Sequence, residues 1–252
     1  MIKGTAFKSA VTRIHLWAGL ILGVQVALWM AGGVVMSWIP IEKVRGEHNV
    51  APKEWLLLNP ASDYVPISEL LANQERGAFS VGLTVLLDRA VYKVARPGDW
   101  LLLADAVTGE TLSLLSEDLA VRIAEADFAG DAPVVSVDLI RERTTEYRHE
   151  TPVWRIRFGD EENTNIYVSP HTGQVRARRN DTWRLFDFFW MLHIMDYGER
   201  TNFNNPLLMA FSASGLVFAL SGIALVVFRL RARRYANDVR SLTRPRPLST
   251  HP

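Results

Sequence analysis

The sequence of 252 residues contains no cysteine. This absence excludes disulfides, iron–sulfur clusters, thiolate-bound metals and covalently attached c-type haem. Any redox cofactor would have to be held by histidine, methionine or noncovalent packing. The sequence also lacks a Gly-rich phosphate loop, a Ser/His/Asp signature and a nucleic-acid-binding motif. Soluble-enzyme functions and a nucleic-acid partner are therefore not expected.

Charge is missing from two long stretches. Residues 14–41 and residues 201–228 each run for 28 positions without Asp, Glu, Lys or Arg. About 20 apolar residues are enough to cross the hydrocarbon of a bilayer. We therefore predict transmembrane helices over residues 11–39 and 206–229. The first stretch carries three tryptophans and is longer than the apolar part of a signal peptide, which favours an uncleaved anchor.

Basic residues flank both predicted helices on the same side. Residues 1–10 contain only basic charges, and the tail over residues 230–252 is rich in arginine. By the positive-inside rule both termini are expected in the cytoplasm. The chain is thus predicted to lie in a bacterial inner membrane, with residues 40–180 in the periplasm.

The region between the helices is predicted to be a mixed α/β domain. Helices are expected to begin near Ser68 and Ser116, where a hydroxyl caps the first turn. Apolar and alternating runs predict strands. The expected strands cover residues 79–87, 91–94, 100–103, 154–158 and 165–169.

Two Gly-containing turns lie 64 positions apart. One runs from Asp105 to Glu110, and the other runs from Ser169 to Gln174. Each follows a strand pair and is expected to lead into a further strand, and its glycine supplies the positive φ of a tight turn. The repeated order predicts a duplicated unit of one helix and an antiparallel sheet. The expected fold class is therefore an α+β membrane protein, with two transmembrane helices flanking the duplicated units.

A further helix is predicted over residues 181–197, before the second span. Its aromatic residues and a capping Asp181 are typical of an amphipathic helix at the membrane–water boundary. Four arginines lie in or just before it, and we expect them to form a solvated face; the alternative is contact with an anion or lipid headgroup. They are Arg176, Arg178, Arg179 and Arg184.

Three groups of residues resemble the PepSY-associated transmembrane family. They are Arg13-Ile14-His15-Leu16-Trp17-Ala18-Gly19-Leu20, the two turns ending in Thr-Gly-Glu and Thr-Gly-Gln, and Trp190-Met191-Leu192-His193. The resemblance implies a tandem PepSY-like domain. Some members resemble membrane haem proteins that reduce ferric siderophores or pass electrons across the inner membrane. The resemblance thus also implies a b-type haem and an electron acceptor in the periplasm.

His15 is the first candidate haem ligand. Gly19 and Gly23 lie one and two turns further along the same helix face, so this face has room for a flat macrocycle. The alternative is that both glycines form a seam for packing against small residues of the second helix. Those residues are Ser212, Gly215, Ala219 and Gly222.

His193 is the second candidate, with Trp190 in the aromatic cradle around it. The helix from His15 to Trp38 is about 35 Å long, so one monomer cannot place both histidines on one iron. A haem would need a second copy, a partner membrane subunit or a nearby methionine. We therefore expect a homodimer or a partner subunit in the bilayer. The alternative is a structural His193.

Two functions follow from these residues. The first is a haem-binding subunit that assists transmembrane electron transfer to ferric chelates, as a membrane oxidoreductase or a part of one. The second is a noncatalytic module that binds or assembles a periplasmic peptide or protein. We predict no catalytic residue and assign no role to His48 or His171. The run from Glu146 to Glu150 is expected to be a charged loop.

Overall fold

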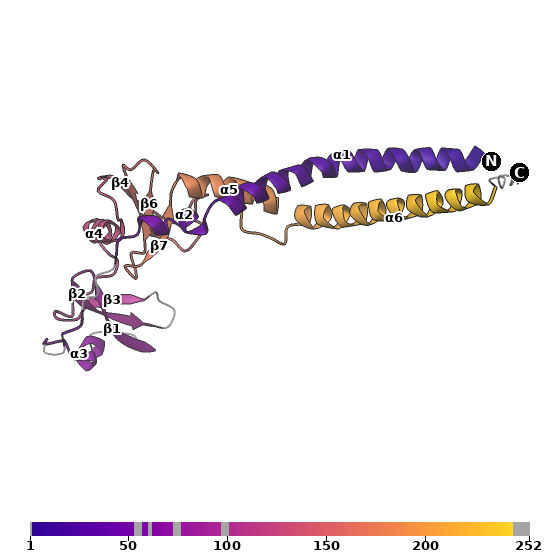
Figure 1. The fold of residues 1–252 in the computed structure, drawn as a ribbon. Helices are drawn as coiled ribbons and strands as arrows, with labels where there is room; N and C mark the ends of the chain where they lie inside the picture. The colour runs from indigo at the N-terminus through magenta and orange to yellow at the C-terminus, as the bar shows by residue number, and fades with distance from the viewer. Residues whose placement is uncertain (1, 53–56, 60–61, 73–76, 97–100, 244–252) are drawn as a thin grey trace, which may run out of the picture. The chain divides into compact units, whose positions relative to one another are not determined.

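The computed structural model describes the chain except for residues 1, 53–56, 60–61, 73–76, 97–100 and 244–252 (Figure 1). It divides into two compact bodies. The helical body contains Met1–Gly33 and Met191–Pro252, and the α/β body contains Val34–Trp190. Each body is described by itself below.

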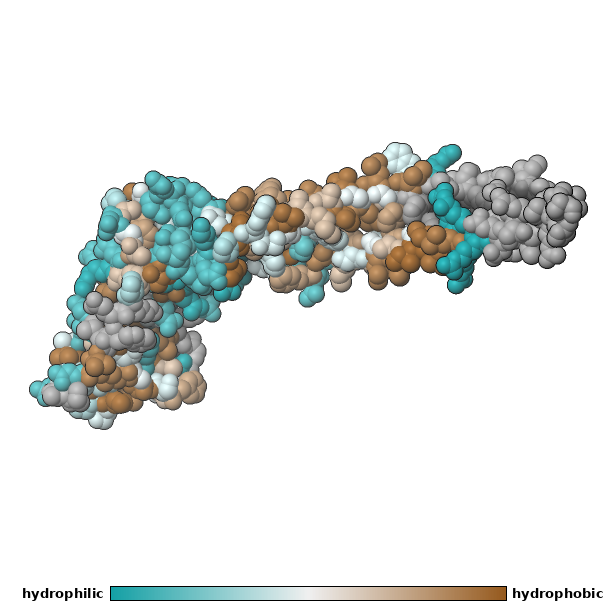
Figure 2. Space-filling view, in the orientation of Figure 1, coloured by the Kyte–Doolittle hydropathy of each residue, from teal (hydrophilic) through white to brown (hydrophobic). Residues whose placement is uncertain are grey.

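Two long helices, α1 (Ile2–Trp38) and α6 (Pro206–Thr243), run antiparallel in the helical body (Figure 1). Their apolar windows, Leu16–Trp38 and Pro206–Ile223, are long enough to cross a membrane. Figure 2 shows apolar side chains along both helices, and none of the second window is buried. Outward-facing apolar residues of this kind suit a lipid environment.

Helix α6 begins as its sequence predicts and ends later. The Leu208 N–H donates to the Asn205 Oδ1 at 2.8 Å, and Pro206 occupies the first helical position, where its missing N–H costs nothing. The basic residues after Phe228 continue the same helix to Thr243, because no helix breaker occurs before Pro245.

The α/β body contains two modules, each of which begins with a helix. It opens with the short helices α2 (Ile41–Val44) and η1 (Glu47–Asn49). The first module is α3 (Ile67–Ala72) with β1 (Ser80–Leu86), β2 (Arg89–Ala95) and β3 (Leu102–Asp105). The second module is α4 (Glu117–Asp127) with β4 (Val134–Ile140), β5 (Val153–Phe158), β6 (Asn165–Val168) and β7 (Val175–Arg179). Both sheets are antiparallel, and their strands neighbour one another in chain order.

Strand β4 has no counterpart among the predicted strands. Its pairing with β5 shifts between Val134 and Ser136, which marks a bulge or irregularity. Such a shift interrupts the period of two on which the prediction of strands depends. The expected helix before it is confirmed, because the Leu119 N–H donates to Ser116 Oγ at 3.4 Å.

One hydrophobic core joins the two modules. Val91 and Leu103 of the first sheet pack with Ile123 of α4 and with Ile156 and Ile166 of the second sheet. The other face of the first sheet packs on α3 through Tyr92, Val94 and Ala104. Residues 64 positions further along, Ile156, Phe158 and Val168, belong to the core that contains α4. Each helix therefore covers the same positions of its own sheet.

The two Gly-containing turns have one conformation. Gly109 and Gly173 have φ values of 72° and 65°, which glycine adopts without steric cost. Asp105 Oδ1 accepts from the Thr108 N–H at 3.0 Å, and Ser169 Oγ accepts from the Thr172 N–H at 3.3 Å. The equivalence was expected from the sequence; that the modules arose by duplication stays a prediction.

Candidate functional site

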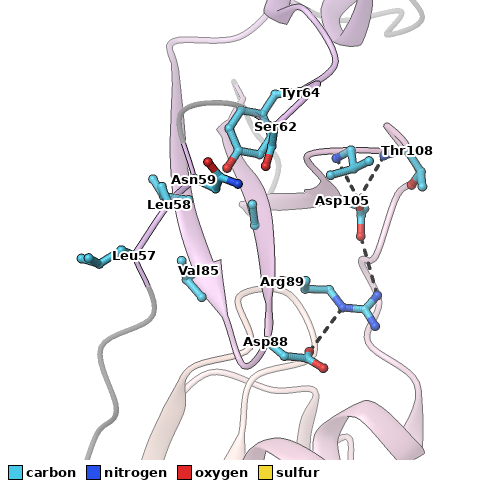
Figure 3. A pocket seen from close by; sticks show the side chains of 12 residues that line it. Leu57, Leu58, Asn59, Ser62, Tyr64, Val85, Asp88, Arg89, Asp105 and Thr108 are labelled. Atoms are coloured by element: carbon cyan, nitrogen blue, oxygen red, sulfur yellow. Dashed lines mark hydrogen bonds and ion pairs between the residues drawn. The ribbon is translucent and has the colours of Figure 1, made fainter.

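An open groove of about 500 Å³ lies in the first module (Figure 3). The segment that precedes α3 supplies Leu58 and Tyr64, and the β1–β2 hairpin supplies Val85 and Arg89. The turn after β3 supplies Thr108. The groove is therefore built from three separate parts of the first module.

Arg89 is the central charge of this groove. Its Nη1 lies 3.7 Å from Asp105 Oδ2, and its Nε lies 3.9 Å from Asp88 Oδ1. The Nε atom is enclosed and has no hydrogen-bond partner in the described part of the chain. Both carboxylates have further contacts, since Asp105 caps its own turn and Asp88 bonds Arg122 at 3.2 Å. The groove thus offers the partly exposed guanidinium of Arg89 rather than a free carboxylate.

Exposed apolar side chains lie beside this donor. Leu57 is 87% exposed and Val107 is 55% exposed, and both line the groove. A concave surface with apolar side chains and a few placed polar groups is typical of binding sites. The Arg89 side chain is 39% exposed, and guanidinium N–H groups donate to peptide carbonyls or carboxylates, so the groove suits a polypeptide ligand.

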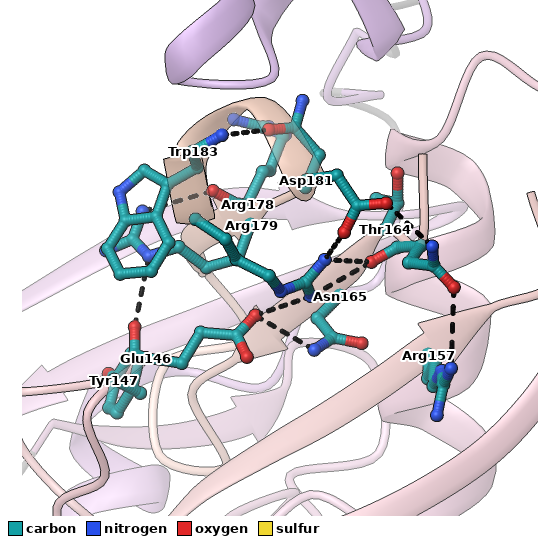
Figure 4. A network of polar contacts seen from close by, with 12 residues as sticks. Glu146, Tyr147, Arg157, Thr164, Asn165, Arg178, Arg179, Asp181 and Trp183 are labelled. Atoms are coloured by element: carbon teal, nitrogen blue, oxygen red, sulfur yellow. Dashed lines mark hydrogen bonds and ion pairs between the residues drawn. The ribbon is translucent and has the colours of Figure 1, made fainter. Parts of the chain in front are cut away.

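A second polar cluster lies in the second module, at the start of α5 (Asp181–Ile194) (Figure 4). The guanidinium of Arg179 lies 4.3 Å from the centre of the Trp183 ring, and its Nε donates to the Glu146 carbonyl at 3.1 Å. Arg184 bonds the side chains of Glu146 and Asp181 at 2.9 and 2.7 Å. These groups tie the start of α5 to the sheet.

Three of the four arginines do not form the solvated face that the sequence suggested, whereas Arg176 is exposed. Arg178 makes a two-point ion pair with the buried Asp127. Burial lowers the pKa of Arg179, and Arg176 lies 3.8 Å from Glu150. The anion or lipid alternative has no support from the contacts of Arg178, Arg179 and Arg184, because protein groups already occupy them. The cap of α5 is also one residue earlier than expected, since Trp183 N–H donates to Asn180 Oδ1 at 2.8 Å.

The connection between β4 and β5 carries the run from Glu146 to Glu150. It is a loop as predicted, but its side chains are partners of α5 and the sheet. Arg148 Nη2 lies 2.7 Å from Oδ2 of Asp187, a pair that is largely buried. Tyr147 stacks on Tyr167 with ring centres 4.7 Å apart. Burial raises the pKa of Tyr167 to about 12 and raises the pKa of Tyr147.

In the helical body, side chains of α1 satisfy the end of α5. Gln25 Nε2 donates to the Leu192 carbonyl at 3.5 Å, and Trp29 Nε1 donates to the His193 carbonyl at 2.9 Å. Helix α5 ends at Ile194 rather than Tyr197, because Met195 has a φ of 53°. Sequence reasoning missed Gln25, the buried polar side chain within the first apolar window.

The predicted haem ligands differ in how far the structure describes them. His15 lies in α1, but its side chain is outside the described part. The His193 side chain is exposed, with its ring 6.3 Å from the ring of Trp29. Among described residues, no group of three or more His, Asp or Glu is placed to hold a metal ion. Haem ligation by these residues therefore stays a prediction.

The expected haem face over Gly19 is partly filled. A Cβ at Gly19 would lie 3.1 Å from the Phe218 ring, whereas a Cβ at Gly23 would meet nothing within 4 Å. The contact at Gly19 is of the kind that the helix-packing alternative predicts, although it involves Phe218 rather than a small residue. Trp190 is half-buried on α5. The residues that the structure describes therefore do not form a haem cradle at Gly19.

Two further histidines lie in the α/β body. His48 Nε2 lies 3.0 Å from Glu162 Oε2, which joins the region before the first module to the second. The His171 carbonyl accepts from Ser113 Oγ at 3.3 Å, and burial lowers the pKa of the His171 side chain.

The family model described as the PepSY-associated TM region matches residues 12–251. The chain belongs to this family. No curated protein and no solved structure matches the chain. Its membrane-associated PepSY character thus rests on the family match together with the two long apolar helices.

Sequence reasoning did not identify the groove of this PepSY protein. Arg89 is a single arginine after an apolar strand, and nothing in its neighbours marks it as central. Its importance comes from Asp105, which the hairpin pairing of β2 with β3 brings beside it. The adjacent apolar residues Leu57 and Leu58 were the sequence feature that could have pointed to the groove.

Proposed function

We propose that this PepSY protein is a noncatalytic, membrane-anchored binding module that holds a polypeptide segment of a partner in the groove around Arg89. The observation that carries the proposal is the partly exposed Arg89 guanidinium, which lies in the groove beside exposed apolar side chains. A peptide carbonyl or carboxylate in the groove would accept a charge-assisted hydrogen bond from this guanidinium.

The groove supports binding more than catalysis. Its two carboxylates, Asp88 and Asp105, are each paired with an arginine, so neither is placed as a free general base. The bilayer anchor fits this reading, because α1 and α6 can hold the α/β body at the surface where a partner passes.

The rival proposal is a b-type haem subunit that assists electron transfer to ferric chelates. It rests on the family resemblance and on His15 and His193. We place it second, because Phe218 covers the face over Gly19 and no described contact points to a haem at His193. An absorption spectrum of the purified chain with added haemin separates the two. A Soret band that is lost in His193→Ala would reverse this order.

We further propose that the chain lies in a bacterial inner membrane with both termini in the cytoplasm and the α/β body in the periplasm. The support is the basic flanks, including the exposed Arg13 and Arg229. Because the chain lacks cysteine, Val135→Cys provides a unique thiol on the α/β body. A membrane-impermeant maleimide should label it with the outer membrane permeabilised; labelling only after the inner membrane is broken would contradict this orientation.

Site-specific photo-cross-linking tests the binding proposal. A photoreactive amino acid at Val107 in the full-length chain should give a discrete adduct with one partner polypeptide in native membranes. The matched control is Val135, a valine of almost equal exposure, 56% against 55%, on the edge of the second sheet. Equal adducts at both positions, or none at Val107, would refute a groove-specific partner.

A further inference from the structure

Strand β1 is an outer strand of the first sheet, with one paired edge among the residues that the structure describes. It pairs only with β2 in the sheet that the structure describes, and Figure 1 shows it at the sheet's margin. None of its seven residues is buried, whereas its neighbour β2 buries Val91, Tyr92 and Val94. An unpaired edge presents backbone donors and acceptors that can template another strand.

The register shows which backbone groups are free for pairing. The Ala106 N–H donates to the Ala90 carbonyl at 2.9 Å, so even-numbered residues of β2 bond β3 and odd-numbered residues bond β1. The partners of those odd-numbered residues are Ser80, Gly82, Thr84 and Leu86. The intervening residues, Val81, Leu83 and Val85, therefore direct their N–H and carbonyl groups away from the sheet.

The other outer strands are partly covered or carry features that oppose such pairing. Strand β3 is bridged by Thr111 at Ala104 and contains Asp105. Strand β4 has a shift of register at Val134 and contains Asp138, and β7 contains three arginines. Bulges and charges are the usual ways in which proteins protect sheet edges. Strand β1, Ser-Val-Gly-Leu-Thr-Val-Leu, has no charge and no proline, and its pairing with β2 shows no irregularity.

We infer that β1 pairs antiparallel with β1 of a second copy of the chain, and that this pairing joins two membrane-anchored copies into a symmetric dimer. The strand is self-complementary: Leu83 at its centre lies opposite Leu83 of the second copy, and Gly82 lies opposite Thr84. No like charges face each other in this arrangement, because β1 is uncharged. A two-fold axis is the commonest symmetry of such assemblies.

The membrane favours this occupant over a soluble strand. Two copies anchored in one bilayer are confined to a surface, which raises the effective concentration of one edge at the other. The inference does not depend on the groove proposal, because it uses the backbone of β1 rather than Arg89.

Cysteine cross-linking tests the dimer in the intact chain, which has no native thiol. One copy carries Gly82→Cys, the other carries Thr84→Cys, and the two bear different tags in one membrane. A Cβ at Gly82 meets nothing within 4 Å, so the change fits the fold. Mild oxidation should yield a disulfide-linked species with both tags. A membrane that contains only one of the two variants should give less cross-linked dimer. In the proposed pairing, the same position in the two copies lies diagonally across the strands rather than directly opposite.

A second pair of variants separates pairing from misfolding. Gly82→Thr and Gly82→Lys both occupy open space, but the lysines of two copies would lie on one face at diagonal positions and repel. Energy transfer between labelled copies in vesicles should persist in Gly82→Thr and be mostly lost in Gly82→Lys. Val135→Cys on β4 serves as the cross-linking control.

Three results would overturn the inference: no two-tag species, cross-linking no stronger than at Val135, or equal energy transfer in both Gly82 variants. An adduct of Gly82→Cys with a different polypeptide would also overturn it and would assign the edge to a partner strand.

Discussion

The two modules each have a helix followed by an antiparallel sheet, but the first sheet has three described strands and the second has four. The connection between the first two strands also differs in length. In the first module Leu87 and Asp88 alone join β1 to β2. In the second module residues 141–152 join β4 to β5. The helix covers the same positions of the sheet in both modules. The longer connection adds side-chain contacts that the two-residue turn lacks.

The longer connection lets the second module hold helix α5 in place. Its residues Glu146 and Arg148 bond Arg184 and Asp187 of α5, the helix that leads toward the second membrane helix. The first module has no such connection and keeps an open groove and an open edge strand. The second module thus holds the start of α5, while the first module carries the groove and the uncharged outer strand.

The largest expected effect comes from removing the ion pair between Arg148 and Asp187, which joins α5 to the second module. Asp187→Ala leaves the largely buried Arg148 without its partner and should cost about 3 kcal/mol of stability. Thermal unfolding of the full-length chain in detergent, followed by tryptophan fluorescence, measures this loss.

The control is the exposed pair in the first module, Asp88 with Arg122. Asp88→Ala should leave the Tm almost unchanged, because solvent screens this pair. The double variant Arg148→Met, Asp187→Leu should recover most of the loss. Equal destabilisation by Asp187→Ala and Asp88→Ala would contradict the claim that contacts of the second module hold α5 in place.

The two equivalent turns give a smaller effect. Gly109→Ala should cost about 1 kcal/mol, because alanine is strained at positive φ. Gly173→Ala should cost about 1 kcal/mol more, since its Cβ would lie 2.8 Å from Leu86 Cδ1, a side chain packed on the shared core. Urea unfolding of the two variants compares them directly. The reverse order would show that Leu86 does not hold the second turn against the first module.

The smallest effect is confined to alkaline pH. Burial raises the pKa of Tyr167 to about 12, above the ordinary value near 10. The unfolded chain therefore loses this proton first, and the associated stability falls as the pH rises from about 10 to 12. Tyr167→Phe keeps the stacking on Tyr147 and should flatten this part of the stability profile. An unchanged alkaline profile in the variant would show that Tyr167 is not the group responsible.

Much of the fold could be predicted because local patterns determine it. Charge-free stretches indicate the long apolar helices, Ser116 marks a helix start, and the Thr-Gly turns mark the strand ends. Strand β4 was missed because the irregular register at Val134 hides its alternation.

The contacts of the candidate sites could not be predicted, because they join distant residues. Arg89 gains its role from Asp105, and Arg148 gains its role from Asp187. The arginines before α5 seemed solvated because their partners, Asp127 and Glu146, are far away in the sequence. Only the folded chain places these groups together.

The central claim is that the first module, and not the second, holds a partner. The most direct measurement compares maleimide labelling of Val107→Cys and Val135→Cys, two otherwise cysteine-free chains whose native valines are almost equally exposed. In purified protein both thiols should react at similar rates. In native membranes Val107→Cys alone should slow, because the groove is occupied. A ratio of rates that is the same in both preparations would contradict the claim.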